Sequence, residues 1–241
     1  MREKVNHIVN WIAEYSGRAK LKTLVVGVSG GIDSAVVSTL CAESGIRTIP
    51  IVMTIRNKDI LALEHVWWLE EKYGHNVSRR VVNLEKIFTE IENASKYIGA
   101  DSELAFANTR SRLRMLMLYQ MAQSEKGLVV GTGNKVEDFG VGFYTKYGDG
   151  GVDISPIADC NKTEVWELAK ELKISQEIID APPTDGLWDD GRTDEGQLGL
   201  SYKELEEAME NENSKNRQKY IQIRNANLHK MDPIPVCKIP S

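Results

Sequence analysis

A short run rich in glycine, serine and aspartate, residues 27–34, has the composition of a phosphate-binding loop. It reads Gly27-Val28-Ser29-Gly30-Gly31-Ile32-Asp33-Ser34 and directly follows an apolar stretch. Two adjacent glycines leave backbone amides free, and amides at the positive end of a helix attract anions. The hydroxyls of Ser29 and Ser34 add hydrogen-bond donors, and the Asp33 carboxylate is suited to hold a divalent cation against phosphate oxygens. The run therefore predicts a nucleotide phosphate site.

This loop differs from two other glycine-rich nucleotide loops. No Lys-Ser/Thr pair follows its second glycine, as a Walker A loop requires, and it lacks the GxGxxG spacing of dinucleotide-binding redox folds. The alternative is a plain strand–turn–helix joint, in which the glycines only permit the turn. Ser-Gly-Gly-x-Asp-Ser is more specific than a lone glycine pattern at such a joint, so it favours the phosphate site.

Short apolar runs that alternate with amphipathic stretches predict the framework around this loop. The apolar runs are continuous, as buried parallel strands are, and cover residues 23–28, 48–52, 77–82 and 128–131. Apolar residues at helical spacing predict helices over residues 5–15, 33–42, 60–72, 84–96 and 102–123. This alternation predicts an α/β fold with a doubly wound, mostly parallel, Rossmann-like sheet and helices on both faces.

The second half of the chain carries fewer strand signals. Residues 131–160 hold seven glycines and are expected to form a shaped loop without a regular element. A helix is predicted over residues 162–173, with Asn161 or Thr163 as its N-cap. Residues 181–199 form a long Pro-, Gly- and Asp-rich loop, and two polar helices follow over residues 202–211 and 214–227. No repeat or linker interrupts the chain, so residues 1–241 are expected to form a single domain.

The predicted helix 102–123 carries both apolar and basic side chains. Its apolar residues are assigned to one face: Leu104, Leu113, Leu116, Met117 and Met121. Three arginines surround that face at positions 110, 112 and 114. The apolar face is compatible with a subunit interface.

Composition excludes several classes of protein. The 241 residues have a mass of 27.0 kDa, with 41% hydrophobic and 27% charged residues, as expected for a globular chain. A net charge of −5 and a pI of about 5.5 argue against a nucleic-acid partner. No apolar run is long enough for a bilayer, and three distant cysteines suggest a reducing compartment. We expect a cytoplasmic enzyme without a nucleic-acid or membrane partner.

Two sequence blocks resemble a known family. The SGGIDS run resembles the pyrophosphate loop of the N-type ATP pyrophosphatases, whose fold is of the adenine-nucleotide alpha-hydrolase type. The run GTGNKVE at 131–137 and the run GFYTKYGDGGVDISP at 142–156 resemble the NAD synthetases. The Lys162-Thr163 helix start, Leu187-Trp188 and His229-Lys230 extend this likeness over nearly the whole chain.

The resemblance implies a reaction and its participants. The carboxylate of nicotinate adenine dinucleotide (deamido-NAD) would attack the α-phosphorus of ATP, and ammonia would then displace AMP to give NAD. Mg²⁺ would be the cofactor and ATP the co-substrate. The chain has no room for a glutaminase domain before its first strand, so free ammonia is expected unless a separate subunit supplies it. The family also implies a homodimer.

The resemblance assigns roles to individual residues. Asp33 and Lys162 would be catalytic, and Asp33 and Glu137 would bind the metal. The residues implied in ATP binding are Gly27, Val28, Ser29, Gly30, Gly31, Ile32, Asp33, Ser34, Thr132, Lys162 and Thr184. Those implied in deamido-NAD binding are Arg112, Lys146, Asp153, His229 and Lys230. Arg110 and Arg114 point elsewhere on the helical repeat and are expected to serve packing or surface pairing.

Several alternatives remain beside this interpretation. Without the resemblance, Glu137 would be a solvated loop acid, Lys146 and Lys162 surface lysines, and Thr184 a turn residue. A tRNA-thiolating enzyme or the ATPase part of GMP synthetase would share the first loop, but the acidic pI, the lack of paired cysteines and the YGDGGVD run argue against both. A nucleotide sensor without chemistry would be expected to have lost Asp33, Glu137 or the loop glycines, and all of them are present.

Overall fold

Four parallel strands form the centre of the computed structural model, which describes residues 1–56, 59–188 and 190–240. Their order across the sheet is β3-β2-β1-β4, and Val25 of β1 lies opposite Ile49 of β2 and Val129 of β4. The strands are β1 (Thr23–Gly27), β2 (Arg47–Thr54), β3 (Arg80–Asn83) and β4 (Gly127–Val130). All four predicted strands are confirmed, with ends that differ by up to three residues.

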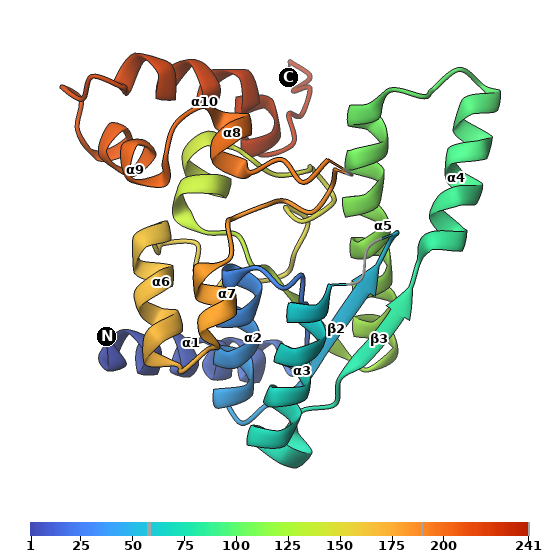
Figure 1. The fold of residues 1–241 in the computed structure, drawn as a ribbon, viewed down its shortest axis with the longest axis vertical. Helices are drawn as coiled ribbons and strands as arrows, with labels where there is room; N and C mark the ends of the chain where they lie inside the picture. Colours follow the sequence, from blue (N-terminus) through green and yellow to red (C-terminus); the bar gives the residue numbers. More distant parts are fainter. Residues whose placement is uncertain (57–58, 189, 241) are drawn as a thin grey trace.

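Helices cover both faces of this sheet (Figure 1). Leu24 and Val26 of β1 pack toward α1, α2 and α6, whereas Val25 packs toward α4 and α5. Val52 of β2 packs against α3. Successive side chains of a strand point to opposite faces, so the continuous apolar runs reflect burial on both sides. The predicted doubly wound fold is confirmed. The covering helices are α1 (Arg2–Ala19), α2 (Ile32–Glu43), α3 (Ile60–Tyr73), α4 (Glu85–Tyr97), α5 (Glu103–Ser124) and α6 (Lys162–Glu171).

A second group of helices lies beyond the carboxyl ends of the strands (Figure 1). It contains a π-helix, η2, with its own small apolar core against α9 and α10. The remaining elements are η1 (Gly74–Asn76), η2 (Lys135–Val141), α7 (Gln176–Asp180), α8 (Asp194–Leu198), α9 (Tyr202–Glu210) and α10 (Arg217–Met231). Within the described residues, no helix is both long and apolar enough to cross a membrane.

Two sequence-based predictions about loops are wrong. Residues 131–160 were expected to lack regular structure, but they contain η2, because the Asn134 side chain accepts hydrogen bonds from the amides of Val136 and Glu137 and starts the helix. Part of the predicted loop 181–199 forms α8, and position 189 of that loop lies outside the described residues. The N-cap of α6 is Asn161, whose backbone amide donates to the Glu164 side chain at 2.9 Å.

The apolar residues of α5 do not share one buried face. Leu113 is buried against the sheet, whereas Leu104 and Leu116 are each 61% exposed. Met117 and Met121 are partly buried at the edge of the same core. The prediction of a single face is therefore wrong, because the sheet and α4 cover only part of this long helix.

Candidate active site

A cavity of about 520 Å³ lies at the carboxyl ends of β1 and β4. The chain passes from β1 to β2 and β3 on one side and then returns to β4 on the other side of β1. Ligands of open α/β sheets bind at such a change of direction. Gly30 in the loop after β1 has φ +87°, and a Cβ there would lie 3.2 Å from the Ala62 amide nitrogen, so this turn requires glycine.

The residues predicted to bind ATP all line this cavity. They come from the loop after β1, the segment after β4, the start of α6 and the segment before α8. They are Gly27, Val28, Ser29, Gly30, Gly31, Ile32, Asp33, Ser34, Thr132, Lys162 and Thr184, and the predicted metal ligand Glu137 lies with them. Segments more than 150 residues apart in the sequence thus meet at one place.

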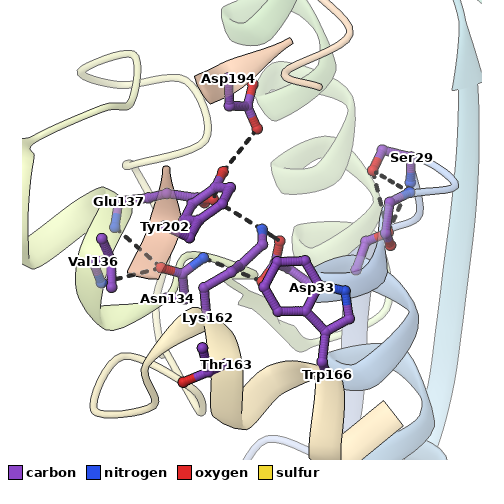
Figure 2. Close-up of polar contacts among 12 residues, drawn as sticks. Ser29, Asp33, Asn134, Val136, Glu137, Lys162, Thr163, Trp166, Asp194 and Tyr202 are labelled. Atoms are coloured by element: carbon purple, nitrogen blue, oxygen red, sulfur yellow. Dashed lines mark hydrogen bonds and ion pairs between the residues drawn. The ribbon is translucent and has the colours of Figure 1, made fainter. Parts of the chain in front are cut away.

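Lys162 is at the centre of the polar contacts in the cavity (Figure 2). Its side chain is 2% exposed, and its Nζ lies 2.5 Å from Asp33 Oδ2 and 2.9 Å from Glu137 Oε1. Burial favours the neutral amine, but the two carboxylates outweigh it and hold the pKa of Lys162 above its usual value. A charged lysine buried between two acids is the opposite of the surface lysine that the sequence alone would suggest.

The two acids in contact with Lys162 differ in their electrostatics. Burial raises the pKa of Asp33, and the negative charge of Glu137 adds to this effect although Lys162 opposes it. Burial also acts on Glu137, but Lys162 and the Tyr202 hydroxyl stabilise its charge and hold its pKa below the usual value. Glu137 is therefore the acid of the pair that its contacts hold ionised.

Asn134 connects these acids and was not identified from the sequence. It is fully buried, and its Nδ2 donates to Asp33 Oδ1 at 3.2 Å while its Oδ1 caps η2 (Figure 2). Because η2 begins at this cap, Asn134 also sets the position of Glu137. An asparagine after a strand and before a short helix is a recognisable N-cap signal, but nothing in the sequence indicates its contact with Asp33.

Asp33 and Glu137 are suited to a magnesium ion. Both carboxylates already meet at one cation, the Lys162 ammonium. Mg²⁺ binds through one or two carboxylates together with phosphate oxygens and water. Among the described residues, no group of three or more histidine, cysteine or acidic side chains could hold a metal. The two acids thus fit an ion whose other ligands come from a bound nucleotide.

Further charged residues line the cavity beyond those predicted. Burial raises the pKa of Asp138 well above its usual value, and the negative charge of Asp149 adds to the effect. Burial, followed by the charge of Glu137, raises the pKa of Asp194 to about 7. Arg114 was expected to serve packing or surface pairing, but it lines the cavity and its Nε donates to the Met53 carbonyl at 3.4 Å. The contact with Met53 agrees with a packing role, but the place of Arg114 on the cavity wall was not predicted.

Arg110 lies outside the cavity, as expected. Its side chain is buried, its guanidinium stacks 5.0 Å from the Phe88 ring centroid, and it donates to the Leu187 carbonyl. These contacts tie α5 to the segment before α8. Arg110 therefore serves packing, in agreement with the prediction.

A second, more open pocket adjoins the cavity, because Met115 and Val152 line both. It contains three of the residues predicted to bind deamido-NAD: Arg112, Lys146 and Lys230. Arg112 Nε donates to the Lys146 backbone carbonyl at 3.2 Å, which ties the Arg112 side chain to that segment. Three tyrosines also line the pocket, at positions 119, 144 and 147. Cations beside aromatic rings suit a phosphate and a flat ring.

The other two predicted residues lie beside this pocket rather than on its wall. Asp153 accepts hydrogen bonds from the Tyr119 hydroxyl at 3.0 Å and from the Val129 amide at 2.8 Å. It therefore holds a wall residue of the pocket against the end of β4. The His229 carbonyl accepts from Lys146 Nζ at 3.3 Å. The terminal His229-Lys230 pair thus reaches the pocket mainly through Lys230, whose Nζ donates to the Tyr144 carbonyl at 2.7 Å.

Comparison with known proteins agrees with this geometry. The NAD synthase family model matches residues 4–236. An NH3-dependent NAD synthetase from Carboxydothermus hydrogenoformans is 38% identical over 215 residues, with 85% of this chain and 83% of that protein covered. Among solved structures, an NMN synthetase from Francisella tularensis matches with a TM-score of 0.90 and 28% identity over 99% of this chain and 98% of that one. An NH3-dependent NAD synthetase from Campylobacter jejuni has the same fold, with a TM-score of 0.78 and 22% identity over 98% and 99% of the two chains. The chain belongs to the NAD synthase family.

Proposed function

We propose that this chain is an ammonia-dependent NAD synthetase, a ligase of class EC 6.3.1.5. It converts deamido-NAD, ATP and ammonia into NAD, AMP and pyrophosphate. The observation that carries the proposal is the buried Lys162 between Asp33 and Glu137, beside a glycine loop and next to a second pocket with three cations. Within the family, this arrangement supplies one site for a triphosphate and one for a nucleotide carboxylic acid.

The reaction proceeds in two displacements. A carboxylate oxygen of deamido-NAD forms a bond to the α-phosphorus of ATP while the bond from that phosphorus to pyrophosphate breaks. Ammonia then forms a bond to the activated carbonyl carbon, AMP leaves with the bridging oxygen, and one proton is released. No protein nucleophile is needed, so the role of the side chains is to position the reactants and to neutralise phosphate charge.

Different residues of the cavity position the reactants and neutralise the phosphate charge. The amides of the 27–34 loop and the Ser29 and Ser34 hydroxyls hold the phosphates of ATP, and Lys162 neutralises negative charge that develops on the leaving pyrophosphate. Asp33 and Glu137 hold Mg²⁺. When bound, this ion neutralises phosphate oxygens and orients the triphosphate. Thr132 and Thr184, which also line the cavity, add hydroxyl donors.

Arg112 offers a test of the second pocket. Replacement of Arg112 with methionine removes a cation from the wall that is assigned to the dinucleotide and leaves the ATP cavity intact. The KM for deamido-NAD should rise about tenfold or more, because one charge-assisted contact contributes about 1.5–3 kcal/mol. The KM for ATP should stay within twofold, as steady-state kinetics with each substrate varied will show. An equal rise in both KM values would contradict the assignment.

The same proposal extends to the domain organisation, the cellular location, the nitrogen donor and the partners of the protein. Residues 1–241 act as one catalytic domain in the cytoplasm, with free ammonia as the nitrogen donor and without a nucleic-acid or membrane partner.

Two copies form a homodimer through α4 and α5, where Tyr97, Ile98, Leu104 and Leu116 are exposed apolar side chains. Sedimentation equilibrium should give twice the chain mass, and Leu116→Asp should shift it toward the monomer.

A second candidate substrate is favoured by one observation. The NMN synthetase structure matches with a TM-score of 0.90, against 0.78 for the Campylobacter NAD synthetase. If this chain made the same product, its acid substrate would be nicotinate mononucleotide, which lacks the AMP half of deamido-NAD. The chemistry at the carboxylate would be unchanged, because both acids carry the same nicotinate group.

An assay with purified protein separates these possibilities. The protein is incubated with Mg-ATP, ammonium chloride and either deamido-NAD or nicotinate mononucleotide, and products are separated by chromatography. We expect NAD and AMP in equal amounts from deamido-NAD, dependent on both magnesium and ammonium, with a higher kcat/KM than for the mononucleotide. A higher kcat/KM for the mononucleotide would make the chain an NMN synthetase, and no amide from either acid would exclude both functions.

A further inference from the structure

Tyr202 is buried beside the acids of the active site, although no motif in the sequence marks it. It is the first residue of α9 and is 1% exposed. Its hydroxyl lies 2.5 Å from Glu137 Oε1 and 3.0 Å from Asp194 Oδ2 (Figure 2). Its ring lies 4.7 Å from Lys162 Nζ and packs edge-to-face against Trp166. The side chain thus contacts both Glu137 and Lys162.

Packing alone does not explain the hydroxyl. A phenylalanine would fill the same apolar space between α6 and α9, whereas a buried hydroxyl costs free energy unless it is hydrogen-bonded. Here the hydroxyl donates to the Glu137 carboxyl, so it is hydrogen-bonded and directed at the acid that is assigned to the metal. The Tyr202 hydroxyl and the Lys162 ammonium both donate to Oε1 of Glu137. Together they fix the Glu137 carboxylate through this one oxygen.

Asp194 is the second carboxyl in contact with the Tyr202 hydroxyl. It is 5% exposed, lines the cavity, and begins α8. Its Oδ2 lies 3.0 Å from the Tyr202 oxygen, and its Oδ1 is buried without a hydrogen-bond partner among the described residues. The phenol has a single proton, and its shorter contact is to Glu137. Asp194 is therefore a second acceptor that competes with Glu137 for this proton over a longer distance.

We propose that Tyr202 is a positioning residue, whose hydroxyl holds the Glu137 carboxylate in the orientation that binds the metal ion. This inference rests on the proposed function, because that function assigns the metal to Asp33 and Glu137. Groups that hydrogen-bond to metal ligands orient them, and their loss costs about 10–100-fold in metal affinity. Tyr202 does not line the cavity, so its hydroxyl reaches the site through Glu137.

The test compares Tyr202→Phe with a matched variant, Tyr220→Phe. Tyr220 is also buried in the core of η2, α9 and α10, and its hydroxyl donates to the Gly140 carbonyl at 3.2 Å, away from the acids. Each variant loses one buried tyrosine hydroxyl, so a purely structural role predicts the same effect for both. Mn²⁺ binding is measured by electron paramagnetic resonance with a non-hydrolysable ATP analogue, and melting temperatures are recorded.

We expect Tyr202→Phe to weaken Mn²⁺ binding about tenfold or more, and Tyr220→Phe to leave it within twofold. The Mg²⁺ concentration for half-maximal NAD formation should rise in parallel for Tyr202→Phe only. Equal Mn²⁺ affinities in the two variants would overturn the proposal. If the wild type formed no NAD, the proposed function would fail, but the Mn²⁺ measurement would still decide whether Tyr202 positions a metal ligand.

A second pair of variants covers the case in which Tyr202→Phe does not fold. Asp194→Asn alters the contact between residue 194 and the Tyr202 hydroxyl and leaves the tyrosine ring in place. The control, Asp190→Asn, changes an exposed aspartate of the same segment that pairs with Arg192. We expect the Mn²⁺ affinity to change in Asp194→Asn alone, because the carboxyl that competes with Glu137 for the tyrosine proton is then an amide. Unchanged binding in both would overturn the positioning role of the Tyr202 hydroxyl.

Discussion

Replacement of Lys162 with methionine should abolish turnover and destabilise the fold together. Methionine is similar in length but leaves Asp33 and Glu137 buried without their shared cation. Removal of one partner from a buried ion pair costs about 3–5 kcal/mol. Loss of the cation at the phosphates should lower kcat at least about 100-fold. Urea unfolding and steady-state kinetics measure the two effects.

The destabilisation by Lys162→Met should depend on pH. Burial and Glu137 raise the pKa of Asp33 even with Lys162 present, and loss of the lysine raises it further. A carboxyl whose pKa is raised in the folded state favours folding when protonated, and this contribution is lost as the pH rises through the folded pKa. The loss in unfolding free energy should therefore be smaller at about pH 5 than at about pH 8. A control is Lys170→Met on the exposed side of α6, which should change neither stability nor turnover. Full activity in Lys162→Met would contradict the proposed role.

Asp33→Asn should abolish most activity with a moderate loss of stability. The amide keeps the shape of the side chain, and its oxygen can still accept a hydrogen bond from Lys162, which stays paired with Glu137. Its nitrogen then faces the Nδ2 donor of Asn134, which loses its acceptor. The charge of Asp33 is lost, so metal binding at the phosphates is weakened and kcat/KM should fall about 10²–10³-fold. The unfolding free energy should fall by about 1–3 kcal/mol, because the buried Asn134 amide is left without its acceptor while no buried charge is left unpaired.

The control for Asp33→Asn is Asp159→Asn, which alters an aspartate whose side chain is 98% exposed. It should keep wild-type kinetics. Turnover in Asp33→Asn equal to the wild type would contradict a catalytic role for this carboxylate. The pair of variants also addresses the sensor hypothesis, because a nucleotide sensor has no wild-type turnover to lose.

The sheet and the phosphate loop were predictable because their signals are local. Burial on both faces makes a strand continuously apolar, as in residues 23–28, and this pattern can be read without knowing what covers the strand. Gly30 needs a left-handed backbone, which is a property of one residue and its neighbours. The prediction failed for η2, because its sequence carries no periodic pattern of apolar residues. That helix depends on a side-chain cap from Asn134.

The residues that line the cavity were predictable mainly from the resemblance to a known family. Considered singly, three of them would be predicted as surface or turn residues: Lys162, Glu137 and Thr184. Only the order of the motifs along the chain indicated that they belong to the site. Asp194 and Tyr202 were missed because they stand in no motif that was recognised. Asn134 lies in the GTGNKVE run but was missed, because nothing in the sequence indicates its contact with Asp33. The burial of α5 was also misjudged, since Leu104 and Leu113 look alike in the sequence but differ in what packs against them.

The sequence by itself determined the fold class, the anion-binding loop and the family, because periodicity, glycine placement and motif order are properties of the chain. Only the tertiary structure decided the electrostatics of the site. Asp33 and Lys162 are 129 residues apart, and Glu137 and Tyr202 are 65 apart. Whether a lysine is a solvated surface charge or a buried bridge between two acids depends on which elements pack around it. Desolvation and charge pairing are set by that packing, and they give Lys162, Glu137 and Tyr202 their properties.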